Sequence, residues 1–336
     1  MGADTRRATI VDVAAAAGVS TTTVSHVLTG RRPVAAATKA RVEAVVADLD
    51  YRANASARHL RTERSGILAL VVPDLTNPFN SAMAAGLHET VLPSGYLAVV
   101  GEAPEPGAPL SGVLRQLLDR GIDGMVLGRF GASEADIDSV AASGTALVRL
   151  GGPLGSGRGD VVRANEVQGM FDIVDHLVHR GYRRIAFADG PAGSSPGGER
   201  QRGYEQALRD AGLPVRDDLV VHTAYTREGG VRAAEALLAG PGPIDAIACC
   251  NDLIAVGVLD VLRARRIGVP GDIAVTGYDD IEAAELMSPA LTTVLNPARE
   301  IGRTSARMLL DRLDHGYTGP DRETILAHRI VARDSA

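Results

Sequence analysis

The chain has 336 residues, 45% of them hydrophobic and 23% charged, which is typical of a globular protein with two or three domains. No apolar run approaches the roughly 18–20 residues of a membrane span, and the first ten residues lack an apolar signal segment, so we expect a cytoplasmic protein. The net charge of −6 is uneven, because the first 64 residues carry +4 and the remainder −10. A basic head on an acidic body indicates a polyanionic partner for the head alone.

The first element that the sequence predicts is a short helix near the start of the chain. Thr9 and Asp12 have the spacing of a capping box, in which each side chain bonds to the other residue's backbone N–H. The apolar residues that follow recur at helical spacing, and Gly18 is placed to end the helix in a left-handed conformation. A helix of about two turns is therefore expected between these residues.

A second helix is expected directly after a tight turn. Ser20 is placed to cap it, and Val19 and Val24 occupy the two positions of a hydrophobic staple. The residues expected on its buried face are Val24, Val27 and Leu28. After Pro33, a third predicted helix carries an apolar stripe made of Val42, Val45, Val46 and Leu49. Two short helices joined by such a turn, here over residues 9–28, predict a helix-turn-helix.

The polar side chains of the second helix are the candidates for reading DNA. Burial of the apolar face leaves Thr21, Thr22 and His26 exposed, where hydroxyl and imidazole groups can reach base edges in the major groove. Thr23 and Ser25 are better placed to contact phosphates. The predicted DNA-binding residues of the head are Thr9, Ser20, Thr21, Thr22, Thr23, Ser25 and His26. Without further support, a small helical domain with no role in nucleic-acid binding remains the alternative.

The motif T-I-x-D-V-A-x-x-A-G-V-S-x-x-T-V-S, which starts at Thr9, resembles the head of the lactose-repressor/galactose-repressor family at nearly every position. The later residues Tyr51–Asn54 and Ala57–Arg61 match the same family. The resemblance strongly favours DNA binding over a helical domain with another role.

The same resemblance implies a hinge helix at residues 54–61, which in the family folds on operator DNA and enters the minor groove at the dimer centre. It implies that Leu60 is an apolar wedge that unstacks a base step, and that the small Ala57 lets two hinge helices approach each other. Arg58 and Arg61 can reach phosphates. The hinge residues predicted to bind DNA are Asn54, Ala57, Arg58 and Leu60. A flexible linker is the alternative for this segment.

From Gly66 onward, short apolar runs alternate with helical stretches such as Gly169–Arg180 and Gln201–Ala211. The predicted strands are Ile67–Val72, Tyr96–Val100, Gly124–Leu127 and Ala146–Leu150, and then Ile185–Ala188, Leu219–His222, Ala246–Cys249 and Ile273–Thr276. Repeated β-α-β units predict parallel sheets that helices cover on both faces. The two series of strands predict two similar lobes.

Residues 66–331 resemble the periplasmic-binding-protein-like core of the same family, from the motif V-P-D-L-T-N-P-F at Val72–Phe79 to the closing Arg333–Ser335. The resemblance implies an all-α helix-turn-helix head plus an α/β core of two doubly wound parallel-sheet lobes, with the chain crossing between lobes near residues 162, 293 and 325. The expected domains are residues 1–53 for the head, 54–64 for the hinge and 65–336 for the core, with lobe 1 at about 65–162 and 294–324 and lobe 2 at about 163–293 and 325–336.

Ligands of such α/β folds bind at the carboxyl ends of the strands. The candidate effector-binding residues, which follow predicted strands or open the next helix, are Asp74, Phe79, Asn80, Arg200, Tyr225, Asn251 and Asp279. By motif, all of them except Asp74 fall where family members contact effector. Aromatic faces can stack on sugar or purine rings, and Arg, Asn and Asp can bind hydroxyls or ring nitrogens. Turn chemistry is the alternative for Asn251 and Asp279.

Four departures from the family pattern affect these expectations. His26 stands where the family usually has Arg, so the preferred base there is expected to differ. Ala35 replaces the usual Ser cap of the third helix, at a cost of about 1 kcal/mol. Ala164 replaces the Asp that usually precedes Asn165, and the loop at residues 151–159 lacks the common acidic or Arg residue. The effector pocket is therefore expected to differ from the family average.

Other patterns do not assemble into a chemical site. Residues 193–197 fit G-x-S-x-G, but the proline and glycines around them are typical of a loop and not of a nucleophile elbow. His176 and His179 have no third ligand for a metal, and the cysteines at 249–250 have neither metal-ligand nor disulfide spacing. The glycines at 155–159 lack the context of a dinucleotide site. We therefore expect no enzyme activity, no metal and no cofactor.

The function that these features predict is a homodimeric transcription regulator, a repressor, which binds a pseudo-palindromic operator. A small-molecule effector between the lobes, by family analogy a sugar or sugar derivative, is expected to control it. The chain shows no leucine heptad after Ser335, which favours a dimer over a tetramer. The alternatives are a solute-binding transport protein, which the core alone would support, and an enzyme on an α/β scaffold.

Overall fold

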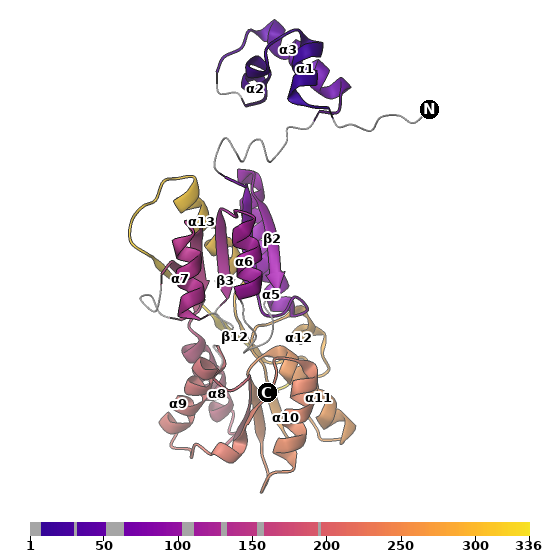
Figure 1. The fold of residues 1–336 in the computed structure, drawn as a ribbon. Coiled ribbons are helices and arrows are strands. Elements are labelled where there is room, and N and C mark those ends of the chain that lie inside the picture. Colours follow the sequence, from indigo (N-terminus) through magenta and orange to yellow (C-terminus); the bar gives the residue numbers. More distant parts are fainter. Residues whose placement is uncertain are drawn as a thin grey trace. The chain divides into compact units, whose positions relative to one another are not determined.

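The computed structural model describes residues 8–29, 32–51, 64–102, 111–128, 133–152, 158–193 and 196–336. The chain divides into two compact units, Met1–Ser65 and Gly66–Ala336 (Figure 1). In the described ranges, no single helix has the length and hydropathy that a membrane crossing requires. The predicted hinge residues Asn54, Ala57, Arg58 and Leu60 lie outside the described residues.

The first unit contains the three predicted helices, α1 (Ile10–Ala17), α2 (Thr21–Thr29) and α3 (Ala36–Asp48). The capping box at the start of α1 is formed, with Asp12 Oδ2 2.8 Å from the Thr9 nitrogen, and Gly18 ends the helix at φ +64°. Ser20 Oγ accepts from the Thr23 nitrogen at 3.1 Å, which caps α2 as predicted. Ala35 provides no side-chain cap for α3.

The core of the head is small. The fully buried residues are Val13, Ala14, Ala17, Val24 and Val42, with Val19, Val27, Val45 and Val46 packed against them. The expectation that Leu28 is buried is wrong, because its side chain is 39% exposed, and Leu49, the last residue of the predicted apolar stripe, is 38% exposed. Both lie in or beyond the last turn of a helix, and a unit of three short helices encloses few side chains.

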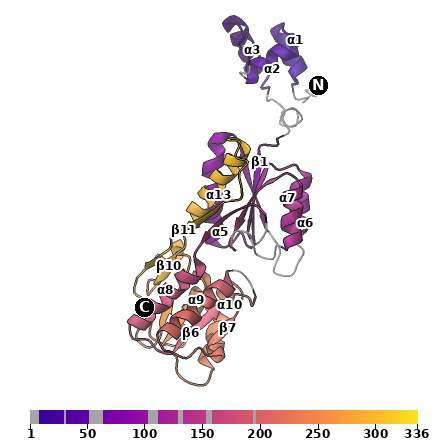
Figure 2. The ribbon, with the colours of Figure 1, turned by 90° about the vertical axis from the view of Figure 1, so that its left-hand side faces the viewer.

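The second unit contains a six-stranded parallel sheet with strand order β11-β5-β4-β3-β1-β2. The strands are β1 (Ile67–Val72), β2 (Leu97–Glu102), β3 (Gly124–Gly128), β4 (Ala146–Leu150), β5 (Asp160–Ala164) and β11 (Glu323–Leu326). Figure 2 shows α5 (Pro78–Val91) and α13 (Ala298–Leu313) on one face of this sheet, and α6 (Ser111–Asp119) and α7 (Glu134–Ala142) on the other. Alternate strand residues accordingly belong to two separate apolar clusters, Leu68 and Leu70 to one and Ala69 and Val71 to the other.

A four-stranded parallel sheet with order β7-β6-β8-β9 forms the second lobe. Its strands are β6 (Ile185–Asp189), β7 (Val220–His222), β8 (Ala246–Cys249) and β9 (Ala274–Thr276). The helices of this lobe are α8 (Glu166–His179), α9 (Gly197–Asp210), α10 (Arg227–Leu238), α11 (Asp252–Ala264) and the short α12 (Glu282–Leu286). Two further strands, β10 (Thr293–Leu295) and β12 (Arg329–Val331), pair antiparallel. Single turns of 3-10 helix lie at Leu92–Ser94 and Asp217–Leu219.

Two predicted crossing points fall inside strands of the first lobe. Ile325 pairs with Arg163 and Leu326 with Ala164, so β5 and β11 continue past residues 162 and 325 before the chain leaves the sheet. These four residues therefore belong to lobe 1 and not to lobe 2. The cause is backbone pairing between the two strands, which satisfies N–H and C=O groups up to the end of the sheet.

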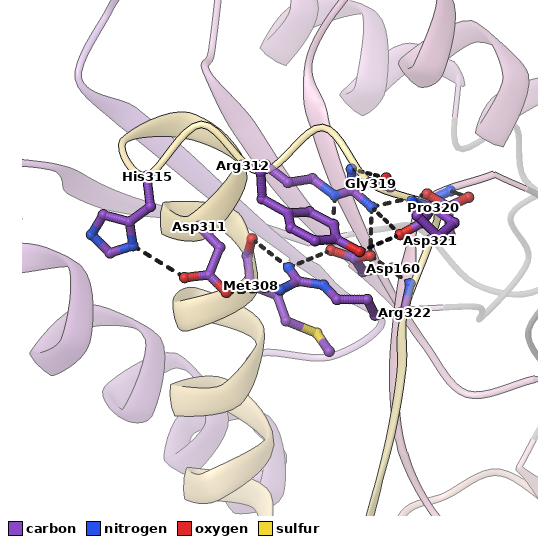
Figure 3. Close-up of polar contacts among 11 residues, drawn as sticks. Asp160, Met308, Asp311, Arg312, His315, Gly319, Pro320, Asp321 and Arg322 are labelled. Atoms are coloured by element: carbon purple, nitrogen blue, oxygen red, sulfur yellow. Dashed lines mark hydrogen bonds and ion pairs between the residues drawn. The ribbon is translucent and has the colours of Figure 1, made fainter.

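Asp160 is the buried centre of an ion-pair cluster at the start of β5 (Figure 3). Its carboxylate accepts from Arg312 Nε at 2.9 Å and Nη2 at 2.7 Å, and from the Arg322 nitrogen at 2.8 Å and Nη2 at 3.1 Å. Both guanidinium groups also lie over the ring of Tyr317. The cluster therefore ties the end of α13 and the segment before β11 to the sheet.

The paired helices of both lobes touch through glycines. A Cβ atom on Gly86 of α5 would lie 2.0 Å from the Arg299 carbonyl oxygen of α13, and one on Gly302 would lie 2.1 Å from the Met83 oxygen. Equivalent backbone contacts occur at Gly203 between α8 and α9 and at Gly230 and Gly257 between α10 and α11. Each helix pair is therefore too close for any side chain at these positions.

We predict that Gly86→Ala lowers the free energy of unfolding by about 1–3 kcal/mol, because α5 and α13 must separate to admit the methyl group. The measurement is a urea titration followed by circular dichroism. The matched control is Gly112→Ala in α6, where a Cβ atom meets nothing within 4 Å. Since alanine favours helix, this control is expected to raise stability by up to about 1 kcal/mol. Equal midpoints for the two variants would contradict the close-contact argument.

Candidate functional site

The N-terminal turn of α2 presents small polar side chains. Thr21 and Thr22 are exposed, and His26, one turn later, is half-buried. Thr23 is half-buried, and its hydroxyl lies 2.9 Å from Ser20 Oγ. The remaining predicted head residues are Thr9, whose hydroxyl belongs to the capping box of α1, and Ser25, which is half-buried. Thr9, Ser20 and Thr23 thus shape the helix ends, whereas Thr21 and Thr22 face outward from the helix end that a helix-turn-helix directs at DNA.

In the first lobe, the loop after β1 is organised by its own hydrogen bonds. Asp74 Oδ1 accepts from the Thr76 nitrogen at 2.7 Å and from its hydroxyl at 2.6 Å, which is turn chemistry. The buried Asn80 donates from Nδ2 to the Asp74 carbonyl oxygen at 2.7 Å. Phe79 is half-buried in the first turn of α5, two residues after the helix cap Asn77. These contacts hold Asp74, Phe79 and Asn80 together beyond the carboxyl end of β1.

In the second lobe, Arg200 of α9 is the centre of a buried polar network. Its Nε donates to Glu166 Oε2 at 2.7 Å, its Nη1 to the Cys250 carbonyl oxygen at 2.5 Å, and its Nη2 to Asp279 Oδ1 at 3.3 Å. The Tyr278 ring covers one face of the guanidinium at 3.7 Å. Burial opposes the charge of Arg200, but Glu166 and Asp279 outweigh it and hold the pKa of Arg200 well above its ordinary value.

Asp279 lies just after β9 in a backbone conformation that non-glycine residues seldom adopt, with φ at +108°. Besides Arg200, its Oδ1 accepts from Asn296 Nδ2 at 3.3 Å. Burial raises the pKa of Asp279 to about 6, although Arg200 acts in the opposite direction. An unusual backbone whose side chain is held by partners from two other segments, α9 and the residues after β10, is typical of a functional position.

The last two predicted effector residues also lie at the carboxyl ends of the second-lobe strands. Asn251 is buried, and its Oδ1 caps α11 by accepting from the Ile254 nitrogen at 2.9 Å. The half-buried Tyr225 has its ring against Gly190, where a Cβ atom would lie 2.2 Å from the ring carbon that bears the hydroxyl. The second lobe thus brings Arg200, Tyr225, Asn251 and Asp279 to one edge of its sheet.

Several polar residues of this edge were missed by the sequence reasoning, namely Glu166, Asp189, His222, Tyr278 and Asn296. Asp189 and His222 are the last residues of β6 and β7, so the rule that selected Asn251 and Asp279 would have found them. Glu166 opens α8, and its importance depends on Arg200, which is 34 residues away. No local pattern marks that partnership.

Most of the other motifs contribute no chemistry to this site. Within the described ranges, no group of three or more His, Cys, Asp or Glu residues has the arrangement of a metal site. Cys249 and Cys250 are buried, free thiols, and burial raises both pKa values well above the ordinary range. The serines at 194–195 and the glycines at 155–157 lie outside the described residues.

Two family models match the chain. Residues 9–54 match that of bacterial regulatory proteins of the lacI family, and residues 174–336 match the periplasmic binding protein-like domain. The chain is 33% identical over 307 residues to the ribose operon repressor of Escherichia coli strain K12, and the aligned region covers 91% of this chain and 93% of that protein. It is 33% identical over 333 residues to the regulator CelR of Thermobifida fusca, covering 97% and 98%.

Two solved structures share the fold of the chain. The lac repressor dimer bound to operator and an anti-inducer superposes with a TM-score of 0.88 at 26% identity, over 98% of this chain and 99% of that one. The complex of CelR with cellobiose superposes with a TM-score of 0.73 at 31% identity, over 98% and 100%. Both similarities extend across the head and the core.

A helix-turn-helix head followed by a core of two parallel-sheet lobes defines a class of DNA-binding transcription regulators. The chain belongs to the lacI family of bacterial regulatory proteins. The predicted family and fold class are confirmed, and members of this family regulate transcription and are not enzymes.

Proposed function

We propose that this protein is a homodimeric repressor that binds a pseudo-palindromic operator in the cytoplasm and is controlled by a small-molecule effector, a sugar or sugar derivative. The observation that carries the effector proposal is the buried network around Arg200. Arg200 bonds to Glu166 of α8, to Cys250 directly after β8 and to Asp279 after β9, and Asp279 in turn accepts from Asn296 after β10. A charged side chain held by so many segments can transmit a change at one of them to the others.

The relatives support this effector class. One is named for the ribose operon, and a lacI-family regulator from Enterococcus faecium, 27% identical over 80% of this chain, was solved with bound ribose. CelR was solved with cellobiose. We infer that the carboxyl ends of β6, β8 and β9 bind the effector together with the loop at Asp74–Asn80 in the first lobe.

Control of operator binding requires that the effector and DNA influence each other. If an effector changes operator affinity by a given factor, the operator must change effector affinity by the same factor. We propose that residues 54–64 form the connection between head and core, with Leu60 as the minor-groove wedge. Calorimetric titration of effector with and without operator tests this coupling.

For the head, we predict that the double variant Thr21→Ala with Thr22→Ala loses about 1–3 kcal/mol of operator affinity, because the hydroxyls facing base edges are removed. Operators are selected from a random duplex library with the parent protein, and binding is measured by gel shift over a salt series. Affinity for unrelated DNA should hardly change, since phosphate contacts dominate it, and it serves as the internal control. Equal losses on both kinds of DNA would remove these threonines from sequence reading.

A further inference from the structure

The edge of the second-lobe sheet that carries Arg200, Tyr225, Asn251 and Asp279 is called the effector edge below. Two further polar residues end neighbouring strands at this edge, and neither forms a hydrogen bond with the side chain of Arg200. Asp189 and His222 are the last residues of β6 and β7, and they are paired in register. Asp189 is 1% exposed, whereas the side chain of His222 is 38% exposed. A buried carboxylate beside a half-exposed imidazole requires a physical explanation, because burial of a charge is costly.

Three donors surround the Asp189 carboxylate. The Gly190 nitrogen donates to Oδ1 at 2.7 Å, His222 Nδ1 lies 3.2 Å from Oδ2, and the Cys250 thiol donates to the same carboxylate. Burial raises the pKa of Asp189, and these donors together with the nearby charge of Arg200 oppose that rise. The buried carboxylate of Asp189 is therefore satisfied as a hydrogen-bond acceptor by groups from its own strand end, from β7 and from the residue after β8.

The contacts of His222 determine where its proton resides. Nδ1 faces two acceptors, Asp189 Oδ2 at 3.2 Å and the Gly190 carbonyl oxygen at 3.2 Å. A nitrogen between two acceptors must carry hydrogen, so the neutral ring is the Nδ1–H tautomer. Its Nε2 then has a free lone pair and acts as an acceptor.

Both neighbours of this pair belong to the effector site. The Tyr225 ring packs on Gly190, the residue whose backbone holds Asp189 and His222. Cys250 donates its thiol to Asp189 and accepts from Arg200 through its carbonyl oxygen. The imidazole of His222 therefore lies at the same edge of the sheet as Tyr225 and Arg200.

The charges at this edge restrict the ligand class. Among the described residues, acidic groups outnumber basic ones there: Glu166, Asp189, Asp252, Asp279 and Asp280 stand against Arg200 and Arg333. The two arginines are already paired, Arg200 with Glu166 and Asp279, and Arg333 with Asp280 at 2.8 Å. Both arginines are thus committed to carboxylates of the protein, and burial raises the pKa of Asp189, Asp252 and Asp279. Among these groups an anionic ligand finds no unpaired cation, whereas hydroxyl groups of a ligand can donate to the carboxyl oxygens.

We propose that His222 contacts the effector by accepting a hydrogen bond at Nε2 from a hydroxyl of an uncharged polyol or sugar, and that Asp189 is the positioning residue that fixes its tautomer. This inference rests on the proposed effector site and adds two residues and a charge class to it. Asp189 acts through His222 in the manner of a carboxylate that orients an imidazole.

The first test is nitrogen-15 NMR of the imidazole in the full-length protein, without ligand. We expect the Nδ1–H tautomer of His222 in the parent. In Asp189→Asn, the amide can donate to Nδ1, and only the Gly190 carbonyl oxygen remains there as an acceptor, so we expect the fraction of the Nε2–H tautomer to rise. A parent ring in the Nε2–H form, or no change in the variant, would overturn the positioning role.

The second test is ligand binding. The parent is screened by thermal shift against uncharged pentoses, hexoses and disaccharides, including D-ribose and cellobiose, and against their phosphate esters. The best sugar is then titrated into His222→Asn, which keeps a donor toward Asp189 but lacks the Nε2 acceptor. We expect about tenfold weaker binding in His222→Asn and in Asp189→Asn, as for one lost hydrogen bond.

The matched control for this titration is His179→Asn, an exposed histidine on α8 that pairs with Asp175 and should leave sugar binding unchanged. Unaltered sugar affinity in His222→Asn, or tighter binding of the phosphate esters, would overturn the proposal. Absence of stabilisation by every uncharged sugar would overturn it as well. Operator binding is measured separately by gel shift. A parent protein that binds no operator would contradict the proposed regulatory function, but it would not contradict the sugar contact of His222.

Discussion

Replacing Asp160 with asparagine is expected to lower the free energy of unfolding by about 3–5 kcal/mol, among the largest losses for a single polar substitution in the core. Asp160 is fully buried and accepts four hydrogen bonds from Arg312 and Arg322. Asparagine would offer one oxygen in place of two and would turn an N–H toward a guanidinium. The two arginines would then lack their common counter-charge, and the measurement is urea unfolding at neutral pH.

The same variant has a defined pH dependence. Burial tends to raise the pKa of Asp160, but the bonds from Arg312 and Arg322 outweigh burial, so the folded pKa lies below the ordinary value of 3.8. A carboxyl group whose pKa is lower in the folded than in the unfolded state stabilises the fold. This stabilisation is fully present above the pKa of the unfolded state and is lost as the pH falls through the pKa of the folded state. The difference between parent and variant should therefore shrink below about pH 4 and stay constant between pH 5 and 8.

The matched control for Asp160→Asn is Asp218→Asn. Asp218 also accepts two hydrogen bonds from one arginine, from Arg216 Nε at 2.9 Å and from Arg216 Nη2 at 2.7 Å, but this pair lies at the surface. Solvent screens such a pair, so the unfolding midpoint should not move measurably. Similar losses in both variants would mean that burial is not what makes the Asp160 cluster strong.

Replacing Arg200 with methionine is expected to abolish the effector response while leaving operator binding in place. Methionine fills a similar volume but donates to none of Glu166, Asp279 or the Cys250 carbonyl oxygen. Two buried carboxylates would lose their cation, which costs about 3–5 kcal/mol and removes the connection between four segments of the effector edge. The response is measured as the change in operator affinity on adding the sugar found by thermal shift.

A second variant separates lost binding from lost stability. In Arg200→Met combined with Glu166→Gln, one of the two uncompensated charges disappears without altering a predicted effector contact, so part of the lost stability should return. The effector response should remain absent, because the guanidinium that joins the segments is still missing. A double variant that regains the response would show that Arg200 acts through stability alone.

Local chemistry in the sequence was sufficient for the head and for the order of the main elements. The capping box at Thr9 and Asp12, the left-handed Gly18 and the Ser20 cap involve residues no more than four positions apart, and all three are present. The buried strands β1, β3, β4, β6 and β8 appear as apolar runs because both of their faces are covered. The strands β5, β10, β11 and β12 were not predicted, since they are short and several of their positions are exposed or polar.

The effector edge was predictable only in part. Position after a strand and family motif selected Arg200, Asn251 and Asp279, which do lie at one edge of the second sheet. Their roles there remain proposals. Asp189 and His222 were not selected, although Asp189 directly follows the predicted strand Ile185–Ala188 and His222 is the last residue of the predicted strand Leu219–His222.

The sequence by itself thus determined the caps, the turn between the first two helices, the parallel-strand pattern and the family motifs. The tertiary structure decided which groups are partners and which apolar residues remain exposed. Arg200 meets Asp279 across 79 residues and Asp160 meets Arg312 across 152, while Leu28 lies uncovered although its spacing is that of a buried residue. The reason is that caps and periodicity depend on neighbours within about one helical turn, whereas ion pairing and burial depend on which distant segments pack together.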